Sequence, residues 1–271
     1  MEEIETVVFC GRLCLFGSRR WALGLAIVVA ALVFAPPLSS STLAGRPHRA
    51  VETQALNGFR ARRAMLRCGG DHGREVALSF DDGPSALTSR LLALLASHHA
   101  AATFFLIGRN IAAYRHAVAA EAAAGDEIGN HTWNHLDLTT LSPSEVDREL
   151  TTTSQAIRAV TGTLPRLMRP PGGMRDAAVD AETRADGLIE TLWSVDPRDW
   201  ASDDPDGIAR TVLSQAAPGA IILLHDGRPA TLAALPMILD GLQARGLRSV
   251  TIPRLLADDP PTSSMCAPPL D

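Results

Sequence analysis

Short β-rich runs alternate with helical segments between residues 74 and 257, and this alternation constrains the fold more than any other feature of the chain. Strands separated by helices form parallel sheets, because each helical crossover returns the chain to the same edge. We therefore expect an α/β protein with about seven parallel strands, open or closed into a barrel. The runs predicted as strands are 76–80, 103–107, 127–130, 166–169, 188–195, 220–224 and 247–251.

Helical patterns fill the segments between these runs. Residues 87–98 and 111–124 are predicted helices, and the clearest helix start lies further along the chain. There Ser142 can cap the helix, Pro143 suits the first helical position, and Glu145 completes a capping box. The sequence therefore predicts a helix that begins at Pro143.

The two ends of the chain differ from this alternating part. Residues 21–35 are an unbroken run of 15 apolar or glycine residues, long enough for a signal sequence and short for a full membrane span. We predict a signal peptide or membrane anchor at 1–44, an Arg-rich linker at 45–73, a catalytic domain at 74–257 and a disordered tail at 258–271. With either a signal or an anchor, the rest of the chain is expected outside the cytoplasm.

Composition excludes several classes of protein. The 25 lysine-plus-arginine residues are all arginine, and the chain has no lysine. Schiff-base chemistry, a P-loop lysine and a Ser-Lys dyad all need a lysine amine, so they are excluded. The net charge of −5 gives no basic field for nucleic acid, and we expect neither a nucleic-acid partner nor an oligomer.

Two short motifs suggest a metal site. His131 and His135 are four residues apart, a spacing that brings two imidazoles to one face of a helical turn. Asp81 and Asp82 lie fifty residues upstream, and one carboxylate can complete a two-histidine, one-carboxylate set that leaves coordination sites open. The other aspartate then remains free to act as a base. Catalysis by a metal-activated water is the first hypothesis.

Chemically active residues also gather at one position relative to the predicted strands. In a parallel barrel, catalytic residues belong at the carboxyl ends of the strands. Those found at or just after a predicted strand end are Asp81, Asp82, His131, Arg169, Asp199 and His225. The shared position supports one site independently of any single motif.

With these motifs in place, the chain resembles the polysaccharide deacetylases of the NodB-homology family, also called carbohydrate esterase family 4. The resemblance covers roughly residues 74–257 and implies a distorted (β/α) barrel, one divalent ion and hydrolysis of N-acetyl groups on sugars. The expected ion is zinc, with cobalt or another transition metal as the alternative. The matching motifs, in the family's order, are SFDDGP at 79–84, HTWNH at 131–135, RPPGG at 169–173, DPRDW at 196–200 and ILLH at 222–225.

The resemblance assigns the central roles residue by residue. Asp82, His131 and His135 match the metal ligands, and Asp81 matches the base that takes the proton of the attacking water. His225 matches the general acid that protonates the departing amine. Because both aspartates follow a strand, we expect them at the mouth of the site and not in the core.

Supporting roles come from the same resemblance. Asp199 matches the carboxylate that keeps the acid imidazole protonated, and Arg169 matches the residue that orients the base. Gly172 stands where the family often has tyrosine; its backbone N–H can still bind the oxyanion, but an aromatic wall of the sugar cleft is lost. Trp200 and Leu223 would line a pocket for the acetyl methyl group, with core packing as the alternative.

Substrate identity stays open at this level. Peptidoglycan N-acetylglucosamine or a chitin-like glycan is the expected substrate, and an O-acetylated polymer is also compatible with the chemistry. One rival hypothesis is a non-catalytic domain that binds an envelope glycan and retains the fold. A non-haem iron oxygenase is a second rival, since it also uses two histidines and a carboxylate.

Four cysteines occur in the chain, and two lie on the exported side of the apolar run. Cys68 precedes the first predicted strand, and Cys266 lies in the tail. The export context permits oxidation, and a barrel can bring its ends together. We therefore predict a disulfide between Cys68 and Cys266.

Overall fold

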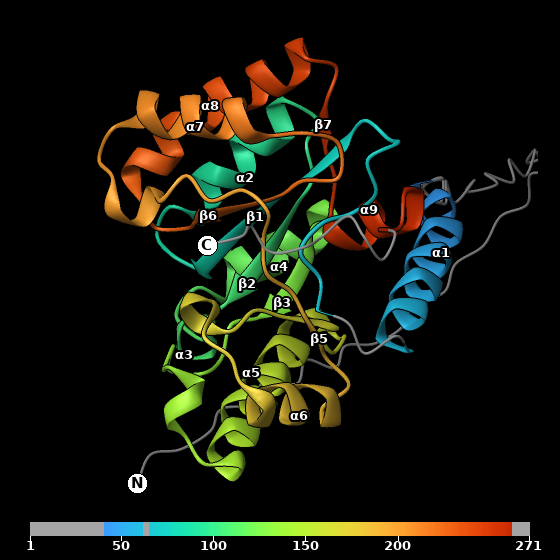
Figure 1. The fold of residues 1–271 in the computed structure, drawn as a ribbon, viewed down its shortest axis with the longest axis vertical. Coiled ribbons are helices and arrows are strands. Elements are labelled where there is room, and N and C mark those ends of the chain that lie inside the picture. The colour runs from blue at the N-terminus through green and yellow to red at the C-terminus, as the bar shows by residue number, and fades with distance from the viewer. Residues whose placement is uncertain (1–40, 62–64, 262–271) are drawn as a thin grey trace, which may run out of the picture. The chain divides into compact units, whose positions relative to one another are not determined.

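The structure, a computed structural model, describes residues 41–61 and 65–261 (Figure 1). Residues 1–40 of the signal or anchor predicted at 1–44, and most of the predicted tail, including Cys266, lie outside the described residues. Within the part described, no helix is both long and apolar enough to cross a membrane. Cys68 is disulfide-bonded, and its predicted pairing with Cys266 stays a prediction.

Seven strands form one sheet within the described residues, and every neighbouring pair runs parallel. The order is β5-β4-β3-β2-β1-β6, and β7 pairs with the start of β1. This arrangement confirms the predicted parallel α/β fold. The strands are β1 (Glu75–Gly83), β2 (Ala102–Leu106), β3 (Glu127–Asn130), β4 (Leu167–Met168), β5 (Ile189–Glu190), β6 (Ile221–His225) and β7 (Arg248–Ser249).

The two edges of the sheet approach each other through the irregular segment that follows β5. Leu223 in β6 donates its N–H to the carbonyl of Val195 at 2.9 Å. Leu192, in the same segment, donates its N–H to the carbonyl of Leu66 at 2.7 Å. Short strands joined by such isolated contacts make a distorted barrel, as the family resemblance implied.

Side-chain alternation along the strands separates an inner from an outer layer. On β1, Val76, Leu78 and Phe80 belong to the outer core, against the helices. Ala77 belongs to a second core inside the barrel, with Phe105 of β2. Residues that continue the inner layer of β1 towards its carboxyl end therefore point into the barrel.

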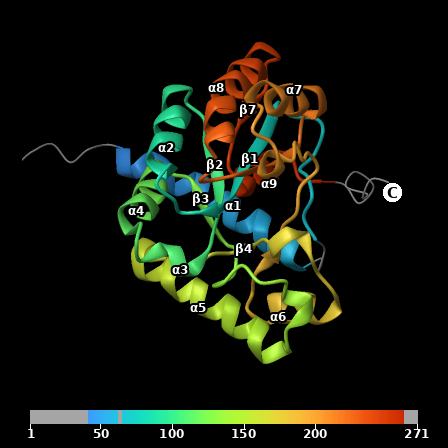
Figure 2. The same ribbon diagram turned by 90° about the vertical axis from the view of Figure 1, so that its left-hand side faces the viewer.

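Helices surround the sheet, as Figures 1 and 2 show from two directions. Those of eight residues or more are α1 (Ser41–Ala61), α2 (Thr88–Ser97), α4 (Arg115–Ala124), α5 (Pro143–Thr161), α6 (Ala177–Ala185), α7 (Pro205–Gln215) and α8 (Pro229–Ala244). The shorter ones are α3 (Gly108–Ile111), α9 (Ile252–Asp258) and the 3-10 turns Leu138–Thr140, Pro171–Gly173 and Asp199–Ala201.

Three predicted helices can be compared with the structure, and α2 (Thr88–Ser97) confirms the one predicted at 87–98. Helix α5 begins at Pro143, and Ser142 donates its N–H to Glu145 Oε2 at 2.8 Å, so the predicted capping box is confirmed. The helix predicted at 111–124 is divided into α3 and α4. The first part starts earlier than predicted because the N–H of Gly108 bonds to a carbonyl of the loop after β3, at 2.9 Å, an interaction that no local pattern reveals.

Residues 41–61 do not form the linker expected for this part of the chain. They form helix α1, which packs on α9 and buries Leu56 in the inner core. Thr53 on α1 also accepts a hydrogen bond from Arg166 at 2.8 Å. At the other end, the carboxylate of Asp259 accepts the N–H groups of His72 and Gly73 at 2.7 and 2.9 Å. The ordered unit therefore extends beyond the predicted 74–257.

Candidate active site

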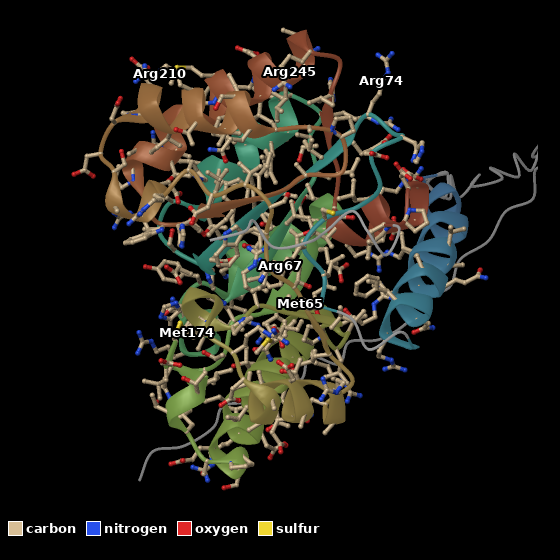
Figure 3. All side chains as sticks on the ribbon, viewed as in Figure 1. Met65, Arg67, Arg74, Met174, Arg210 and Arg245 are labelled. Carbon is tan, nitrogen blue, oxygen red and sulfur yellow. The ribbon has the colours of Figure 1, made fainter. Side chains whose placement is uncertain are left out.

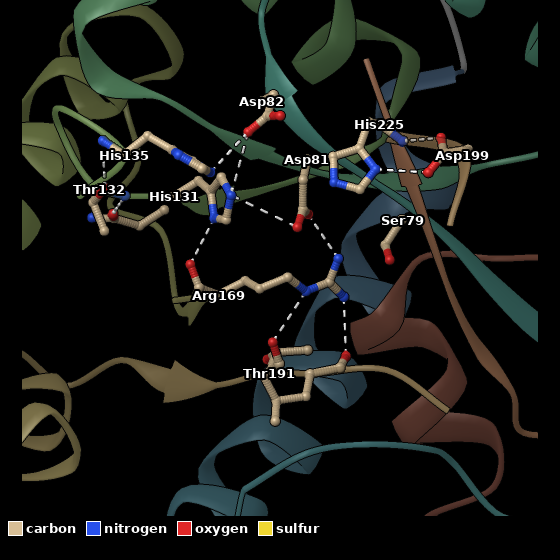
Figure 4. A network of polar contacts seen from close by, with 12 residues as sticks. Ser79, Asp81, Asp82, His131, Thr132, His135, Arg169, Thr191, Asp199 and His225 are labelled. Atoms are coloured by element: carbon tan, nitrogen blue, oxygen red, sulfur yellow. Dashed lines mark hydrogen bonds and ion pairs between the residues drawn. The ribbon is translucent and has the colours of Figure 1, made fainter. Parts of the chain in front are cut away.

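Pairing between β1 and β6 places Asp81 directly opposite His225. Asp226 donates its N–H to the carbonyl of Asp81 at 2.8 Å, which extends the pairing past the end of β6. Asp81 and His225 continue the inner layer of their strands, two residues beyond Ser79 and Leu223. The predicted base and the predicted acid are therefore held as neighbours by the backbone of two adjacent strands (Figure 4).

Asp82 departs from the strand geometry. Adjacent residues of a strand point to opposite faces, so Asp81 and Asp82 would separate if β1 continued regularly. Asp82 instead has a φ of 69°, and the pairing with β2 is irregular between Phe80 and Gly83. Its Oδ1 lies 3.2 Å from Nε2 of His135 and 3.6 Å from Nε2 of His131. The backbone turn thus brings both aspartates to one site.

The histidine motif lies in a loop and not in the helical turn that its spacing suggested. His131 follows β3 and donates its N–H to the carbonyl of Leu106 at 3.0 Å. The φ values of Thr132 and His135 are 64° and 59°, so two of these five residues adopt the left-handed backbone conformation and not that of a regular helix. The two imidazole rings still meet, with centroids 4.9 Å apart. The prediction of adjacent histidines is right, but its helical explanation is wrong.

Asp82, His131 and His135 could hold a metal ion, because one ligand atom from each lies within 4.8 Å of the others. Two observations test the fit. Asp82 Oδ1 is buried and has no hydrogen-bond partner. His131 Nδ1 lies 2.7 Å from the carbonyl of Arg169, which can only accept, so the proton sits on Nδ1 and the lone pair of Nε2 is free for an ion.

Burial also lowers the pKa of His131, which favours the neutral imidazole that binds metals. Two histidine nitrogens and one carboxylate oxygen are ligands that zinc accepts, with coordination positions left open. The residues present therefore fit a divalent ion of this type.

Arg169 is a fully buried arginine inside the barrel. Its Nη1 donates to Asp81 Oδ1 at 2.7 Å, and its other guanidinium nitrogens donate to the carbonyls of Thr191 and Leu192 at 3.1 and 3.0 Å. The guanidinium also lies 4.2 Å from the ring centroid of Phe105. Asp81 is only 3% exposed. It is therefore half of a buried ion pair, contrary to the expectation that both aspartates lie at the mouth.

His225 is paired with Asp199. Nδ1 of His225 lies 2.8 Å from one oxygen of Asp199, and the other oxygen accepts the N–H of His225 at 2.8 Å and the hydroxyl of Thr231 at 2.5 Å. Burial alone would lower the pKa of His225. The hydrogen bond to Asp199 and the negative charges of Asp81, Asp199 and Asp82 outweigh it, and the pKa is raised. An imidazole in this setting keeps its proton to a higher pH.

The three residues predicted to bind substrate lie in different surroundings. Gly172 is exposed in the 3-10 turn after Arg169 and has a φ of 61°, a region that suits glycine. Two residues on, Met174 is 49% exposed (Figure 3). Trp200 is 47% exposed, which removes core packing as its role, whereas Leu223 is buried one step before His225 on β6. Their substrate contacts stay predictions.

Sequence patterns missed several residues that support the site. Thr231 comes from α8, and Thr191 and Leu192 contribute only backbone carbonyls, which carry no sequence signal. Glu149 of α5 contacts the histidine loop, 15 residues from Asn134. No sequence pattern singled it out.

Taken together, the cluster of two histidines and a carboxylate lies beside a buried base-type carboxylate and an Asp-paired histidine. This arrangement lies at the carboxyl ends of parallel strands and has the parts that a hydrolase needs. Comparison with known proteins agrees with that class. The sequence model of the family described as polysaccharide deacetylase matches residues 69–189.

Individual relatives match a longer stretch of the chain, which includes most of the residues that the structure describes. The chain is 41% identical, over 198 residues, to a chitooligosaccharide deacetylase of Bradyrhizobium sp. (strain ANU 289), covering 67% of this chain and 90% of the relative. The solved Bc1960 peptidoglycan N-acetylglucosamine deacetylase is 32% identical with a TM-score of 0.69, covering 74% of this chain and 96% of that one. A structure described as a pseudoenzyme of carbohydrate esterase family 4, from Bacillus anthracis, is 29% identical with a TM-score of 0.68, covering 72% and 69%.

The chain therefore belongs to the polysaccharide deacetylase family. It is accordingly an enzyme of the polysaccharide deacetylase type, a hydrolase.

Proposed function

We propose that this enzyme requires a divalent ion, zinc in the first place, and removes N-acetyl groups from N-acetylglucosamine units of peptidoglycan or of a chitin-like glycan. One observation carries the proposal: Asp82, His131 and His135 present their ligand atoms within 4.8 Å of one another. Asp81 and His225 lie directly beside that cluster, on paired strands. The names of the relatives support the choice of polymer, since they include chitooligosaccharide and peptidoglycan deacetylases.

An ion held by Asp82, His131 and His135 would lower the pKa of a bound water and polarise the acetyl carbonyl. Asp81 takes a proton from the attacking water as the new carbon–oxygen bond forms. His225 donates its proton to the sugar nitrogen as the carbon–nitrogen bond breaks, because an unprotonated amine is a poor leaving group. The products are acetate and a glycan with a free amine.

Other side chains prepare these two groups for proton transfer. Arg169 fixes one oxygen of Asp81 by a hydrogen bond of 2.7 Å and leaves the second oxygen for the proton. Asp199 accepts the hydrogen bond of His225 Nδ1, so the proton to be donated is carried by Nε2. We assign oxyanion binding to the backbone N–H of Gly172, and contact with the acetyl methyl group to Trp200 and Leu223.

We also propose that the enzyme works outside the cytoplasm, where envelope glycans lie. Residues 21–35 would provide the export signal or, if they are not removed, a membrane anchor. The catalytic unit is expected to act as a monomer.

Acetate release tests the proposal. Purified protein is stripped with a chelator, reloaded with zinc, and incubated with peptidoglycan, chitin oligomers and O-acetylated xylan. We expect release from the first two only after zinc is restored. The similarity to a pseudoenzyme makes this test necessary. Protein that binds zinc tightly and releases acetate from none of these polymers would support the non-catalytic alternative.

A further inference from the structure

The loop of residues 131–135 carries two of the three proposed metal ligands, yet it has no regular secondary structure. Positive φ angles at Thr132 and His135 are unfavourable for residues other than glycine. Such a backbone persists only where its surroundings impose it. Whatever imposes this conformation also fixes the separation of the two imidazoles.

Glu149, in the middle of α5, makes the densest set of contacts to this loop. Its Oε2 accepts the backbone N–H groups of Trp133 and Asn134 at 2.8 and 2.7 Å, and its Oε1 accepts the side-chain amide of Asn134 at 2.7 Å. Glu149 is only 7% exposed. Figure 2 shows α5 running below α3 and the core strands. One buried carboxylate thus binds two of the three residues that separate His131 from His135.

The other hydrogen bonds that hold the loop join uncharged groups, and they include backbone bonds from Gly108 and Arg109 of α3 to the carbonyls of Thr132 and Trp133, at 2.9 and 3.3 Å. Asn130 accepts the N–H of Thr132 at 2.8 Å, and the hydroxyl of Thr132 accepts the N–H of His135 at 3.0 Å. Hydrogen bonds to an ionised carboxylate are stronger than these neutral ones. A carboxylate also accepts three N–H donors without presenting a hydrogen of its own. Glu149 is therefore the principal polar restraint on the middle of the loop.

Packing restrains the loop on the side of α3, where the ring of Trp133 lies against Gly108, but it is looser on the side of α5. On the side of α5, an open cavity of about 350 Å³ lies against the loop, lined by Trp133, Leu136, Leu141 and Glu149 among others. Removal of the carboxylate would leave the N–H groups of Trp133 and Asn134 without their acceptor on this side of the loop.

From these contacts we infer that Glu149 is a positioning residue that preorganises the histidine loop for the metal ion. The inference rests on the metal site proposed above. Glu149 does not touch the ion or the substrate; it acts through the backbone of Trp133 and Asn134. Partners that orient metal ligands typically contribute 10–100-fold in metal affinity. We expect a loss of about that size when the carboxylate is removed.

The experiment compares zinc affinity, measured by competition with a chelating dye, in the full chain and its variants. Glu149→Ala should bind zinc about 10–100-fold more weakly than the unmodified protein. Glu149→Gln should stay within a few-fold of the unmodified protein, because one amide oxygen still faces the backbone N–H groups and Asn134 can turn its amide over to match. Rescue by glutamine would show that hydrogen-bond geometry, more than charge, holds the loop.

Glu145→Ala is the matched control. Glu145 lies one turn earlier on α5 and closes its capping box, so its removal should lower helix stability without touching the loop. Thermal unfolding of the metal-free proteins will report this loss. Zinc affinity should remain that of the unmodified protein, which separates helix stability from loop positioning.

Three outcomes distinguish the possibilities. If Glu149→Ala folds and binds zinc as tightly as the unmodified protein, the inference is overturned. If that variant does not fold, Glu149→Asp decides, because a side chain one methylene shorter cannot keep all three bonds and should lose several-fold in affinity; unchanged affinity overturns the inference. If the unmodified protein itself binds no zinc, the proposed metal site fails instead.

Discussion

Replacing Asp81 by asparagine separates two consequences of one buried ion pair. Asp81 is the proposed base, and it is also the partner of Arg169, whose guanidinium is fully buried. Asparagine keeps the shape of the side chain but removes its charge. We expect the variant to lose activity because the proton acceptor is gone. We also expect it to lose stability because the arginine charge stays buried without its counterion.

The size of the stability loss follows from the geometry. Removing one partner of a buried pair costs about 3–5 kcal/mol. Asparagine retains an oxygen that can accept from Arg169 Nη1, and two carbonyls still bind the other guanidinium nitrogens, so we take the lower limit, about 3 kcal/mol. For a unit of this size that corresponds to a fall of roughly 10 °C in melting temperature. Urea unfolding of the chelator-treated protein measures the loss in free energy of unfolding directly.

Asp82→Asn is the matched control, one residue along the same strand. Its Oδ1 has no hydrogen-bond partner, so the metal-free variant should be as stable as the unmodified protein or slightly more stable. Its zinc affinity should fall sharply, whereas Asp81→Asn should retain zinc. Equal unfolding midpoints for Asp81→Asn and the unmodified protein would refute the buried-pair argument. Loss of zinc by Asp81→Asn and not by Asp82→Asn would reverse the assignment of base and ligand.

Three further predictions concern the acid and the disulfide. His225→Ala should retain zinc and lose about 10²–10⁴-fold in kcat, and turnover near that of the unmodified enzyme would remove it from the mechanism. The acid works only while protonated, so kcat/KM should fall as pH rises through the pKa of His225, which is raised in this site. Asp199→Asn removes a cause of that shift, and the falling limb should move to lower pH; an unmoved limb contradicts the role of Asp199. Peptide mapping under non-reducing conditions should recover Cys68 linked to Cys266, and two free thiols in the exported protein would contradict the pairing.

Sequence patterns predicted the strands well because parallel strands of a barrel are short buried runs bounded by helices. The middle of each strand was placed within a few residues, and the strand ends carried the chemistry as expected. The boundary of α3 escaped prediction because its first N–H groups bond to the loop after β3, a partner distant in sequence. Helix α1 escaped because its arginines and weak apolar pattern resemble a solvated linker, although Leu56 is buried in the core and Ala55 and Phe59 pack against it.

The candidate site was likewise predicted only in part from the sequence. Asp81, Asp82, His131 and His135 were singled out from spacing, and the structure brings them together; their catalytic and ligand roles stay predictions. The conformation of the loop was not predictable, because positive φ angles at Thr132 and His135 depend on acceptors supplied by α5 and β3 and not on local preference. The burial of Asp81 was missed for a related reason, since its depth depends on an arginine 88 residues away.

The direct pairing of Asp81 with His225 has a consequence for how this family can vary. The pairing of β1 with β6 sets the distance between the proposed base and the proposed acid. A shift of one residue in this pairing would turn the His225 imidazole out of the barrel. Rim segments such as the glycine turn at 172 and the exposed tryptophan at 200 take no part in that pairing. These rim segments, which we propose contact the glycan, can therefore change residue by residue without disturbing the proposed proton-transfer pair. In this barrel, the spacing of the proposed catalytic pair and the make-up of the rim can change independently of each other.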